Sequence, residues 1–300
     1  MRVEEAAALV PTPFAERIAR LDADGGPSGA DWVAALPHLV AEILDTWSLT
    51  LDGDPMTGHG ALVLPVRGED GVAALKLGWP HTEAGGEHLA LRAWDGHGAV
   101  RLLRADPRRS LLLLERLTSE DLHGPWDEEA VAAIAGLYPQ LHVDPLPQVA
   151  PLVPRVAQIL SRPAAHQLPR RLVEQAGSTL RSLEADGAAA RLLHGDLHYG
   201  NILSDGTDWV AIDPKPVNGH PAWEVAPLLS NRVEEMGTGA SLRWSVRRRV
   251  EIVCDVAGLA EDVVRPVAAL RGVVHAIWAV GDGDTERVSR SISLIKALGD

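Results

Sequence analysis

The sequence has 300 residues, of which 46% are hydrophobic, and its formal net charge is −13. This length fits one large domain or two smaller ones, and the composition is globular rather than disordered or fibrous. The acidic balance argues against a nucleic-acid partner, which normally needs a basic face. It suits a cationic small-molecule ligand, although solubility alone explains it equally well.

The first residues and the cysteine content indicate the cellular compartment. Residues 1–14 carry acids where a secretory signal has basic residues, and no apolar run approaches the roughly 20 residues that span a bilayer. The single cysteine, Cys254, excludes an intramolecular disulfide. We therefore expect a cytoplasmic protein that needs no membrane, and nothing in the sequence indicates an obligate protein partner.

The first third of the chain is rich in predicted strands. Apolar patterning predicts them at residues 49–51, 61–66, 72–77, 99–106 and 109–117. Glycine and aspartate within residues 67–71 predict a hairpin turn. Two helices accompany the strands, over residues 31–47, interrupted by Pro37, and over residues 81–96, despite two early glycines.

The pattern becomes mainly helical after Leu117. Asp127 is expected to cap a helix that extends to His142. Further helices are predicted over residues 169–187, 241–260 and 261–280. The change predicts an α+β fold with an N-terminal lobe of residues 1–116 and a C-terminal lobe of residues 117–300.

The segment LLHGDLHYGNILSDGTDWVAIDPKP, residues 192–216, carries the densest polar chemistry. Asp205-Gly206 lies between two apolar strips, which predicts a short hairpin whose open end brings Asn201 and Asp213 side by side. One amide oxygen and one carboxylate make a hard-oxygen site that suits Mg²⁺ and leaves positions for phosphate oxygens.

Asp196 lies five residues before Asn201, in a loop flanked by glycines. A carboxylate there can accept a proton from an incoming hydroxyl group. A base, an asparagine and a metal-binding aspartate in this order suit phosphoryl transfer, in which the protein mainly positions groups and neutralises charge.

His194 and His198 raise the alternative of a zinc site. The segment has no nearby thiolate, and its glycines disfavour the continuous helix that would align the two imidazoles. We expect His194 to orient the loop by a backbone hydrogen bond, and His198 to pack or to contact substrate.

A nucleotide site also needs a cation for the phosphates. The strand AALK, residues 73–76, resembles the V-A-I-K strand of protein kinases, whose lysine contacts the α- and β-phosphates. Lys76 would take that role and Ala74, on the same strand face, would lie against adenine; alternatively, Lys76 is a snorkelling lysine on an edge strand. A helix carboxylate should pair with Lys76, and Glu87 is favoured over Glu83.

Two further segments are candidates for nucleotide contacts. The segment GDPMTGHGALVL, residues 53–64, holds three glycines before a strand, as a loop over phosphates would, but it lacks a complete G-x-G-x-x-G. Backbone groups near Arg116 and Leu117, where the two lobes join, would bind the base, which leaves ATP and GTP open.

These motifs resemble the aminoglycoside phosphotransferase family, relatives of the protein kinases. HGDLHYGN resembles the family's H-G-D-x-x-x-x-N loop, and AIDPKP resembles its metal-binding I-D segment. The branch of streptomycin 6-phosphotransferases and hydroxyurea phosphotransferases is most similar, through ALVLPV, ALKL, LRAWDGHGAVRLL and LLLER. The resemblance implies a protein-kinase-like fold, with a small antiparallel-sheet lobe, a larger helical lobe and the nucleotide in the cleft.

Carried over residue by residue, the resemblance implies Asp196 as the catalytic base and Asn201 and Asp213 as Mg²⁺ ligands. It implies Lys76 on the ATP phosphates, paired with a helix glutamate.

The sequence departs from the family after the metal aspartate, where His220 and Glu224 stand at two usually acidic places. The substitution by His220 bears on acceptor specificity more than on catalysis. Acids that could meet a cationic acceptor lie near the C-terminus, namely Asp255, Glu261, Asp262, Asp282 and Asp284, although most such acids are simply solvated.

The function predicted from the sequence is an ATP- and Mg²⁺-dependent kinase that phosphorylates a hydroxyl group of a streptomycin-type aminoglycoside, inactivating the antibiotic. One alternative is a kinase for another hydroxylated metabolite or for hydroxyurea. A second, from another class, is a regulator that binds nucleotide without transferring phosphate.

Overall fold

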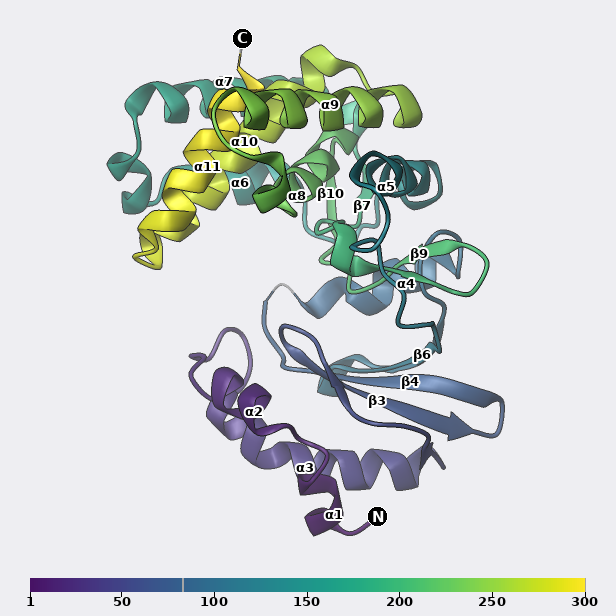
Figure 1. Ribbon diagram of the computed structural model, residues 1–300. Helices are drawn as coiled ribbons and strands as arrows, with labels where there is room; N and C mark the ends of the chain where they lie inside the picture. The colour runs from purple at the N-terminus through teal and green to yellow at the C-terminus, as the bar shows by residue number, and fades with distance from the viewer. Residues whose placement is uncertain (83, 300) are drawn as a thin grey trace. The chain divides into compact units, whose positions relative to one another are not determined.

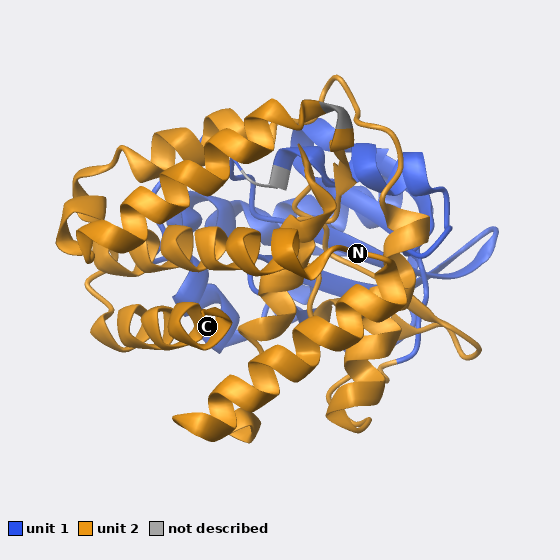
Figure 2. Ribbon diagram, turned by 90° about the horizontal axis from the view of Figure 1, so that it is seen from above, with its two compact units in different colours: residues 1–118 blue, residues 119–300 orange. Residues whose placement is uncertain are grey.

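The computed structural model describes residues 1–82 and 84–299. The chain divides into two compact units, Met1–Thr118 (unit 1) and Ser119–Asp300 (unit 2), which are coloured separately in Figure 2. The sequence placed its boundary between residues 116 and 117, in the same connecting segment.

Unit 1 is built on a six-stranded antiparallel sheet. Strands β1, β3, β4, β6 and β5 lie in that order, and β2 also pairs with β3. The bounds are β1 Thr50–Leu51, β2 Met56–Thr57, β3 Ala61–Gly68, β4 Gly71–Gly78, β5 Leu102–Asp106 and β6 Leu111–Glu115. The register of β3 and β4 ends at the pair Gly68–Gly71, so the turn lies where glycine and aspartate predicted it.

The two faces of this sheet have different surroundings because side chains alternate along β4. Leu75 and Leu77 point to the face that forms the buried core. The helices α1 (Val3–Ala7), α2 (Thr12–Ile18) and α3 (Gly29–Thr46) contribute to this core, and they lie together on one side of the sheet in Figure 1. Ala74 and Lys76 belong to the opposite face, on the side of α4.

Helix α4 is shorter than the helix predicted over residues 81–96. A 3-10 turn covers Ala84–Gly86, and the α-helix covers Glu87–Trp94. Glycine is costly in a helix because it loses the most backbone freedom, which explains why the α-helix begins only after Gly86. Glu87 is therefore its first residue, not an interior one.

Unit 2 is mainly helical and also contains short strands (Figure 1). Its helices are α5 Asp127–Leu141, α6 Leu152–Leu160, α7 Arg170–Ala185, α8 Val225–Leu229, α9 Ala240–Ala257, α10 Glu261–Gly281 and α11 Thr285–Leu298. Its strands are β7 Arg191–Leu193, β8 Ile202–Ser204, β9 Trp209–Ala211 and β10 Val217–Gly219. β7 pairs with β10 and β8 with β9, both antiparallel.

Helix α10 corrects the expectation that no apolar segment reaches membrane-spanning length. Among the described residues it is the one helix long and apolar enough to qualify, and 56% of its apolar window is buried inside the protein. A buried core helix passes the same test. Arg271, within α10, donates hydrogen bonds to the carbonyl oxygens of Trp223 and Gly195, so this helix also supports polar structure.

Helix α5 begins differently from the prediction. Its N-cap is Trp126, and Asp127, the expected cap, is the first helical residue. The Asp127 carboxylate instead accepts hydrogen bonds from Tyr199 and Arg249. A bidentate guanidinium partner is stronger than a backbone N–H cap, which explains the difference.

Candidate active site

The hairpin of β8 and β9 brings Asn201 next to Asp213. Its register pairs Ile202 with Ala211, and one step further the Ile212 amide donates to the Asn201 carbonyl oxygen at 2.8 Å. Asp213 follows Ile212 directly. The two residues predicted as metal ligands therefore flank the open end of this hairpin.

The loop fixes the orientation of the Asn201 side chain. Asn201 Nδ2 donates to the Asp196 carbonyl oxygen at 2.9 Å, and the side chain is buried. Because the amide nitrogen makes this bond, Oδ1 is the atom that can face a cation. An amide oxygen beside the Asp213 carboxylate is a donor set that fits Mg²⁺.

Asp213 has an unusual backbone conformation. Its φ is 56°, in the left-handed region that residues other than glycine seldom adopt. Such a conformation costs about 1–3 kcal/mol and is found most often at functional sites. The strain at Asp213 is thus consistent with a side chain positioned for function.

Asp196 forms an ion pair with Lys215. Lys215 Nζ lies 2.5 Å from Asp196 Oδ2, and the two side chains are 33% and 24% exposed. Burial raises the pKa of Asp196, but the Lys215 ammonium more than offsets this effect and brings the pKa to about 2. Asp196 is therefore ionised at neutral pH and able to accept a hydrogen bond from a hydroxyl group.

Lys215 was not among the residues predicted for the site. The signal that could have identified it is composition, because only three of the 28 basic residues Lys and Arg are lysines. Two of these three, Lys76 and Lys215, form buried or half-buried ion pairs with carboxylates. A compact ammonium on a flexible stem suits a site where one cation serves several partners.

His194 ties the loop to the hairpin through both ring nitrogens. Nε2 lies 2.9 Å from the Ile212 carbonyl oxygen, and Nδ1 accepts from the Asp196 amide at 3.3 Å. These partners require a neutral ring with its proton on Nε2, and burial lowers the pKa of His194 to about 4. This is the backbone hydrogen bond expected of His194, and it disfavours zinc. His198 Nδ1 accepts from the Gly200 amide at 3.2 Å.

Two buried charged side chains fix both polar groups of Gly195. Glu224 Oε1 accepts from the Gly195 amide and Oε2 from the His194 amide, each at 2.8 Å. Arg271 Nη2 donates to the Gly195 carbonyl oxygen at 2.6 Å. Gly195 has a φ of +82°, and a Cβ there would lie 2.0 Å from the Lys215 carbonyl oxygen. Only glycine fits this position.

Glu224 and His220 show what the departures from the family pattern do locally. Burial raises the pKa of Glu224 to about 7, opposed by Arg271 and by the two backbone amides. Its carboxylate spans two successive amides of the loop. His220 Nδ1 accepts from the Ala222 amide at 3.1 Å, so its ring caps the turn that leads to Glu224.

In unit 1, Lys76 is paired with Glu87. Lys76 Nζ lies 2.7 and 2.8 Å from the two carboxylate oxygens, and both side chains are about one-tenth exposed. Glu83, the alternative partner, lies outside the described residues. Because β4 lies between β3 and β6, the interpretation of Lys76 as an edge-strand lysine is wrong.

The glycine-containing segment of residues 53–64 forms a second hairpin. It includes β2 and the start of β3, and its turn is closed by the Gly58 amide on the Ala61 carbonyl oxygen at 2.9 Å. Arg17 donates to the carbonyl oxygens of Gly58 and His59. A role over phosphates stays a prediction.

Arg116 and Leu117 follow the last residue of β6. Arg116 Nε donates to the Ala73 carbonyl oxygen at 2.9 Å and Nη2 to that of Val66 at 3.1 Å. Its guanidinium is therefore engaged with the sheet, and contact of the Arg116 and Leu117 backbone with a base stays a prediction.

Three of the five C-terminal acids proposed for a cationic acceptor have local partners. Glu261 lies 3.7 Å from Arg265, Asp282 lies 2.9 Å from Arg287, and Asp284 accepts from the Arg287 amide as the cap of α11. These contacts support structural roles for the three acids.

Sequence comparison identifies relatives over nearly the whole chain. Residues 46–283 match the family described as aminoglycoside/hydroxyurea antibiotic resistance kinase. The chain is 37% identical to a streptomycin 6-kinase of Streptomyces glaucescens, covering 96% of each sequence. It is 38% identical to a hydroxyurea phosphotransferase of Kitasatospora aureofaciens, over 91% of this chain and 82% of that one.

Solved structures show the fold. A choline/ethanolamine kinase family protein of Mesorhizobium loti superposes with a TM-score of 0.60 at 14% identity, covering 85% of this chain and 93% of its own. An aminoglycoside phosphotransferase solved with ADP and hygromycin B gives 0.58 at 13% identity, covering 87% and 98%. The protein-kinase-like fold implied by the sequence is thus confirmed. The chain belongs to the aminoglycoside/hydroxyurea antibiotic resistance kinase family and is a phosphotransferase.

Proposed function

We propose that this protein transfers the γ-phosphoryl group of ATP, with Mg²⁺, to a hydroxyl group of a streptomycin-type aminoglycoside. The observation that carries the proposal is the arrangement of one loop and one hairpin. Asp196, ion-paired with Lys215, lies on the loop that ends at Asn201, and Asn201 flanks Asp213. This set combines a hydroxyl acceptor, a cation and two hard-oxygen ligands.

Each unit carries residues of its own that we propose for nucleotide binding. Asn201 and Asp213 would hold Mg²⁺, which when bound neutralises charge on the phosphate oxygens. Lys76, oriented by its two hydrogen bonds to Glu87, would contact the α- and β-phosphates. Ala74 would lie against the adenine, and the backbone near Arg116 and Leu117 would bind its edge.

In the transfer step, Asp196 aligns the acceptor hydroxyl by accepting its hydrogen bond. The acceptor oxygen forms a bond to the γ-phosphorus as the bond to the β,γ-bridging oxygen breaks, and ADP leaves. The hydroxyl proton moves to the Asp196 carboxylate. Lys215, beside Asp196, would stabilise negative charge on the transferred group.

Two observations support a cationic aminoglycoside as the acceptor. The chain is 37% identical over 96% of its length to a streptomycin 6-kinase, and its net charge of −13 is compatible with a cationic ligand. Hydroxyurea is the second candidate, because a hydroxyurea phosphotransferase is equally similar. Another hydroxylated metabolite would use the same nucleotide chemistry.

A coupled ADP-release assay tests the proposal. Purified protein with Mg-ATP is offered streptomycin, other aminoglycosides, hydroxyurea and simple sugars. The catalytic variant is Asp196→Asn, and the matched control is Asp208→Asn, an exposed aspartate in the turn of the same hairpin. We expect turnover with streptomycin that Asp196→Asn abolishes and Asp208→Asn retains. Turnover with hydroxyurea alone would show that hydroxyurea, not an aminoglycoside, is the acceptor. Equal turnover by both variants would contradict the role of Asp196.

A further inference from the structure

Tyr199 is a buried residue of the loop with no part in the chemistry described above. It lies between Asp196 and Asn201 and begins the 3-10 turn Tyr199–Asn201. Its side chain is 0% exposed. A fully buried tyrosine usually places its hydroxyl against a specific partner, so the identity of that partner is informative.

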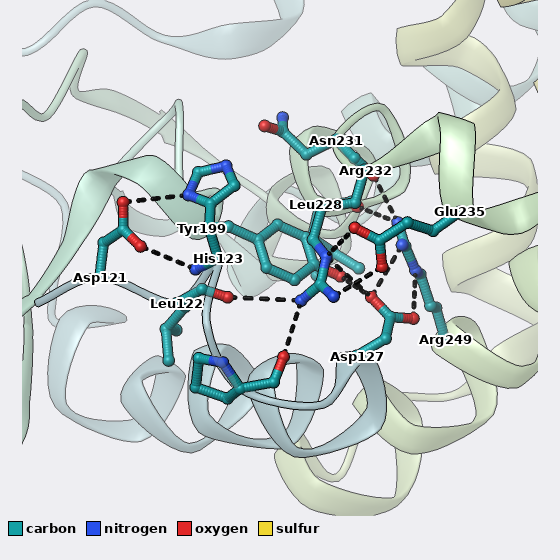
Figure 3. A network of polar contacts seen from close by, with 11 residues as sticks. Asp121, Leu122, His123, Asp127, Tyr199, Leu228, Asn231, Arg232, Glu235 and Arg249 are labelled. Carbon is teal, nitrogen blue, oxygen red and sulfur yellow. Dashed lines mark hydrogen bonds and ion pairs between the residues drawn. The ribbon is translucent and has the colours of Figure 1, made fainter.

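The partner of the Tyr199 hydroxyl is an ion pair. The hydroxyl donates to Asp127 Oδ1 at 2.8 Å, and Arg249 binds both oxygens of the same carboxylate, through Nε at 3.0 Å and Nη2 at 2.8 Å. Figure 3 shows these contacts converging on Asp127. The third nitrogen of Arg249 donates to the carbonyl oxygens of Leu228 and Asn231, so the guanidinium itself is immobilised.

Two guanidinium groups also contact the aromatic ring. The Cζ atoms of Arg232 and Arg249 lie 5.3 and 5.4 Å from the ring centroid, within the range of a cation–π interaction. Arg232 is fixed by a bidentate ion pair with Glu235, at 2.8 and 2.6 Å.

The same network binds the chain that enters unit 2. Arg232 Nη1 donates to the carbonyl oxygens of Leu122 and Pro125, at 3.4 and 3.0 Å. The segment between Ser119 and Trp126 is thereby attached to the residues that surround Tyr199 (Figure 3). The loop is thus anchored to elements from three distant parts of the sequence.

Tyr199 is connected to Asn201 by very short covalent and hydrogen-bonded paths. The Asn201 amide donates to the His198 carbonyl oxygen at 2.9 Å and closes the turn that contains Tyr199. Asn201 Nδ2 in turn donates to the Asp196 carbonyl oxygen. A displacement of the Tyr199 ring therefore moves both Asn201 and the backbone of Asp196.

We infer that Tyr199 is a positioning residue, whose hydrogen bond to the Asp127–Arg249 ion pair sets the geometry of Asn201 toward Mg²⁺ and of Asp196 toward the acceptor. This inference rests on the proposed function for what Asn201 and Asp196 bind. Asp127, Arg249 and Arg232 would orient the loop through their contacts with the Tyr199 side chain.

Replacement of single hydroxyl groups tests the inference by activity. Tyr199→Phe removes the bond to Asp127 and keeps the ring. The matched control is Tyr138→Phe, because the Tyr138 hydroxyl is also buried but has no hydrogen-bond partner among the described residues. We expect Tyr199→Phe to lower kcat and to raise the Mg²⁺ concentration needed for half-maximal activity, each by about 10- to 100-fold, as for other groups that orient metal ligands. The KM for the acceptor should stay the same, and Tyr138→Phe should change none of these values.

A spectroscopic measurement tests the same inference without relying on turnover. The chain has two tyrosines, so protein labelled with 3-fluorotyrosine gives two ¹⁹F resonances, and the Tyr138→Phe variant assigns both. With ADP present, titration with MgCl₂ should shift the Tyr199 resonance and leave that of Tyr138 in place.

The outcomes separate this inference from the proposed function. The positioning role would be overturned if the chemical shift of Tyr199 did not change with MgCl₂. It would also be overturned if Tyr199→Phe left kcat and the Mg²⁺ dependence unchanged. A variant with only a lower melting temperature would show a purely structural role and would overturn it as well. If the wild type phosphorylated no acceptor, the proposed function would fail, and the ¹⁹F titration would still decide the role of Tyr199.

Discussion

Lys215 Nζ lies 2.5 Å from Asp196 Oδ2, although 19 residues separate the two in sequence. The antiparallel pairing of β7 with β10, which aligns Leu193 with Val217, brings them together. Next to this pair, the Lys215 amide donates to the His194 carbonyl oxygen at 2.8 Å, two residues before Asp196. The base proposed for catalysis is therefore paired with a cation two residues after Asp213, the aspartate proposed to bind Mg²⁺.

Replacing this cation should change both the rate and its pH dependence. In the wild type the pKa of Asp196 is about 2. Protonation of Asp196 should therefore cause no fall in rate at ordinary pH. Lys215→Met removes the ammonium that lowers the pKa of Asp196 and leaves the burial that raises it. The rate should therefore fall on the acid side at a pH above the usual pKa of an aspartate. We also expect kcat to fall by about 100-fold, as for loss of one preorganised charge.

The measurement is a pH–rate profile for Lys215→Met, with Lys296→Met, an exposed lysine, as the control. A profile for Lys215→Met that coincides with the wild type would show that Lys215 does not control Asp196.

Gly195 should tolerate no side chain. Its φ of +82° already disfavours alanine, and the added Cβ would collide with the Lys215 carbonyl oxygen at 2.0 Å. Gly206→Ala is the matched control, since Gly206 has a φ of +101° but nothing within 4 Å of the added Cβ. Gly206→Ala should cost about 1 kcal/mol of unfolding free energy, the effect of a positive φ alone. In denaturant titrations Gly195→Ala should lose more unfolding free energy than Gly206→Ala, and it should also lose activity. Equal losses of unfolding free energy would contradict the close approach of Gly195 to the Lys215 carbonyl oxygen.

Glu224→Gln should weaken the loop even though the shape of the side chain is conserved. Glu224 accepts hydrogen bonds from two successive backbone amides. In Glu224→Gln the side-chain NH₂ group would lie against one of these N–H groups, and neither can accept a hydrogen bond. Leaving a buried donor unsatisfied costs about 1–3 kcal/mol. We expect a lower melting temperature and a lower kcat than for Glu234→Gln, which changes an exposed glutamate of the same unit. Unchanged values would show that the two amide contacts contribute little.

The free energy of unfolding should decrease at acidic pH because His142 is buried in its neutral form. Burial, followed by Arg191 and His220, lowers the pKa of His142 from 6.5 to about 4. The unfolded chain therefore binds a proton that the folded chain excludes, and stability present above the unfolded pKa is lost as pH falls toward 4. The full difference corresponds to about 3 kcal/mol.

His142→Phe removes this titration and keeps an aromatic ring beside Tyr138, at a centroid distance of 4.7 Å in the wild type. Chemical denaturation at about pH 7.5 and about pH 4.5 should show a smaller acid loss for the variant than for the wild type. Equal losses would mean that His142 is protonated in the folded state.

Elements with local signals could be predicted from the sequence. The hairpin around Asp205-Gly206 was predicted because an Asp-Gly turn signal between apolar strips is local in the sequence. The pairing of Asn201 with Ile212 follows from it, and residues 205–208 connect the two strands. The pairing of Lys76 with Glu87 followed from a kinase-like strand motif placed just before a helix.

The interactions that the sequence did not reveal join distant residues. Asp127 was expected to cap a helix, but its carboxylate binds Arg249, which lies 122 residues away. Arg271 contacts Gly195 across 76 residues, and no periodicity of α10 distinguishes it from a surface arginine. Such partners are set by tertiary packing, which leaves no local pattern in the sequence.

Phosphoryl transfer from Mg-ATP to a hydroxyl group of streptomycin is best tested by identifying the product. Streptomycin incubated with the protein and Mg-ATP is analysed by mass spectrometry and ³¹P NMR, with Asp196→Asn in parallel. We expect the wild type to form streptomycin that is heavier by one phosphoryl group and gives a phosphate monoester signal, and we expect no such product with Asp196→Asn. Unmodified streptomycin after complete incubation with the wild type would contradict it.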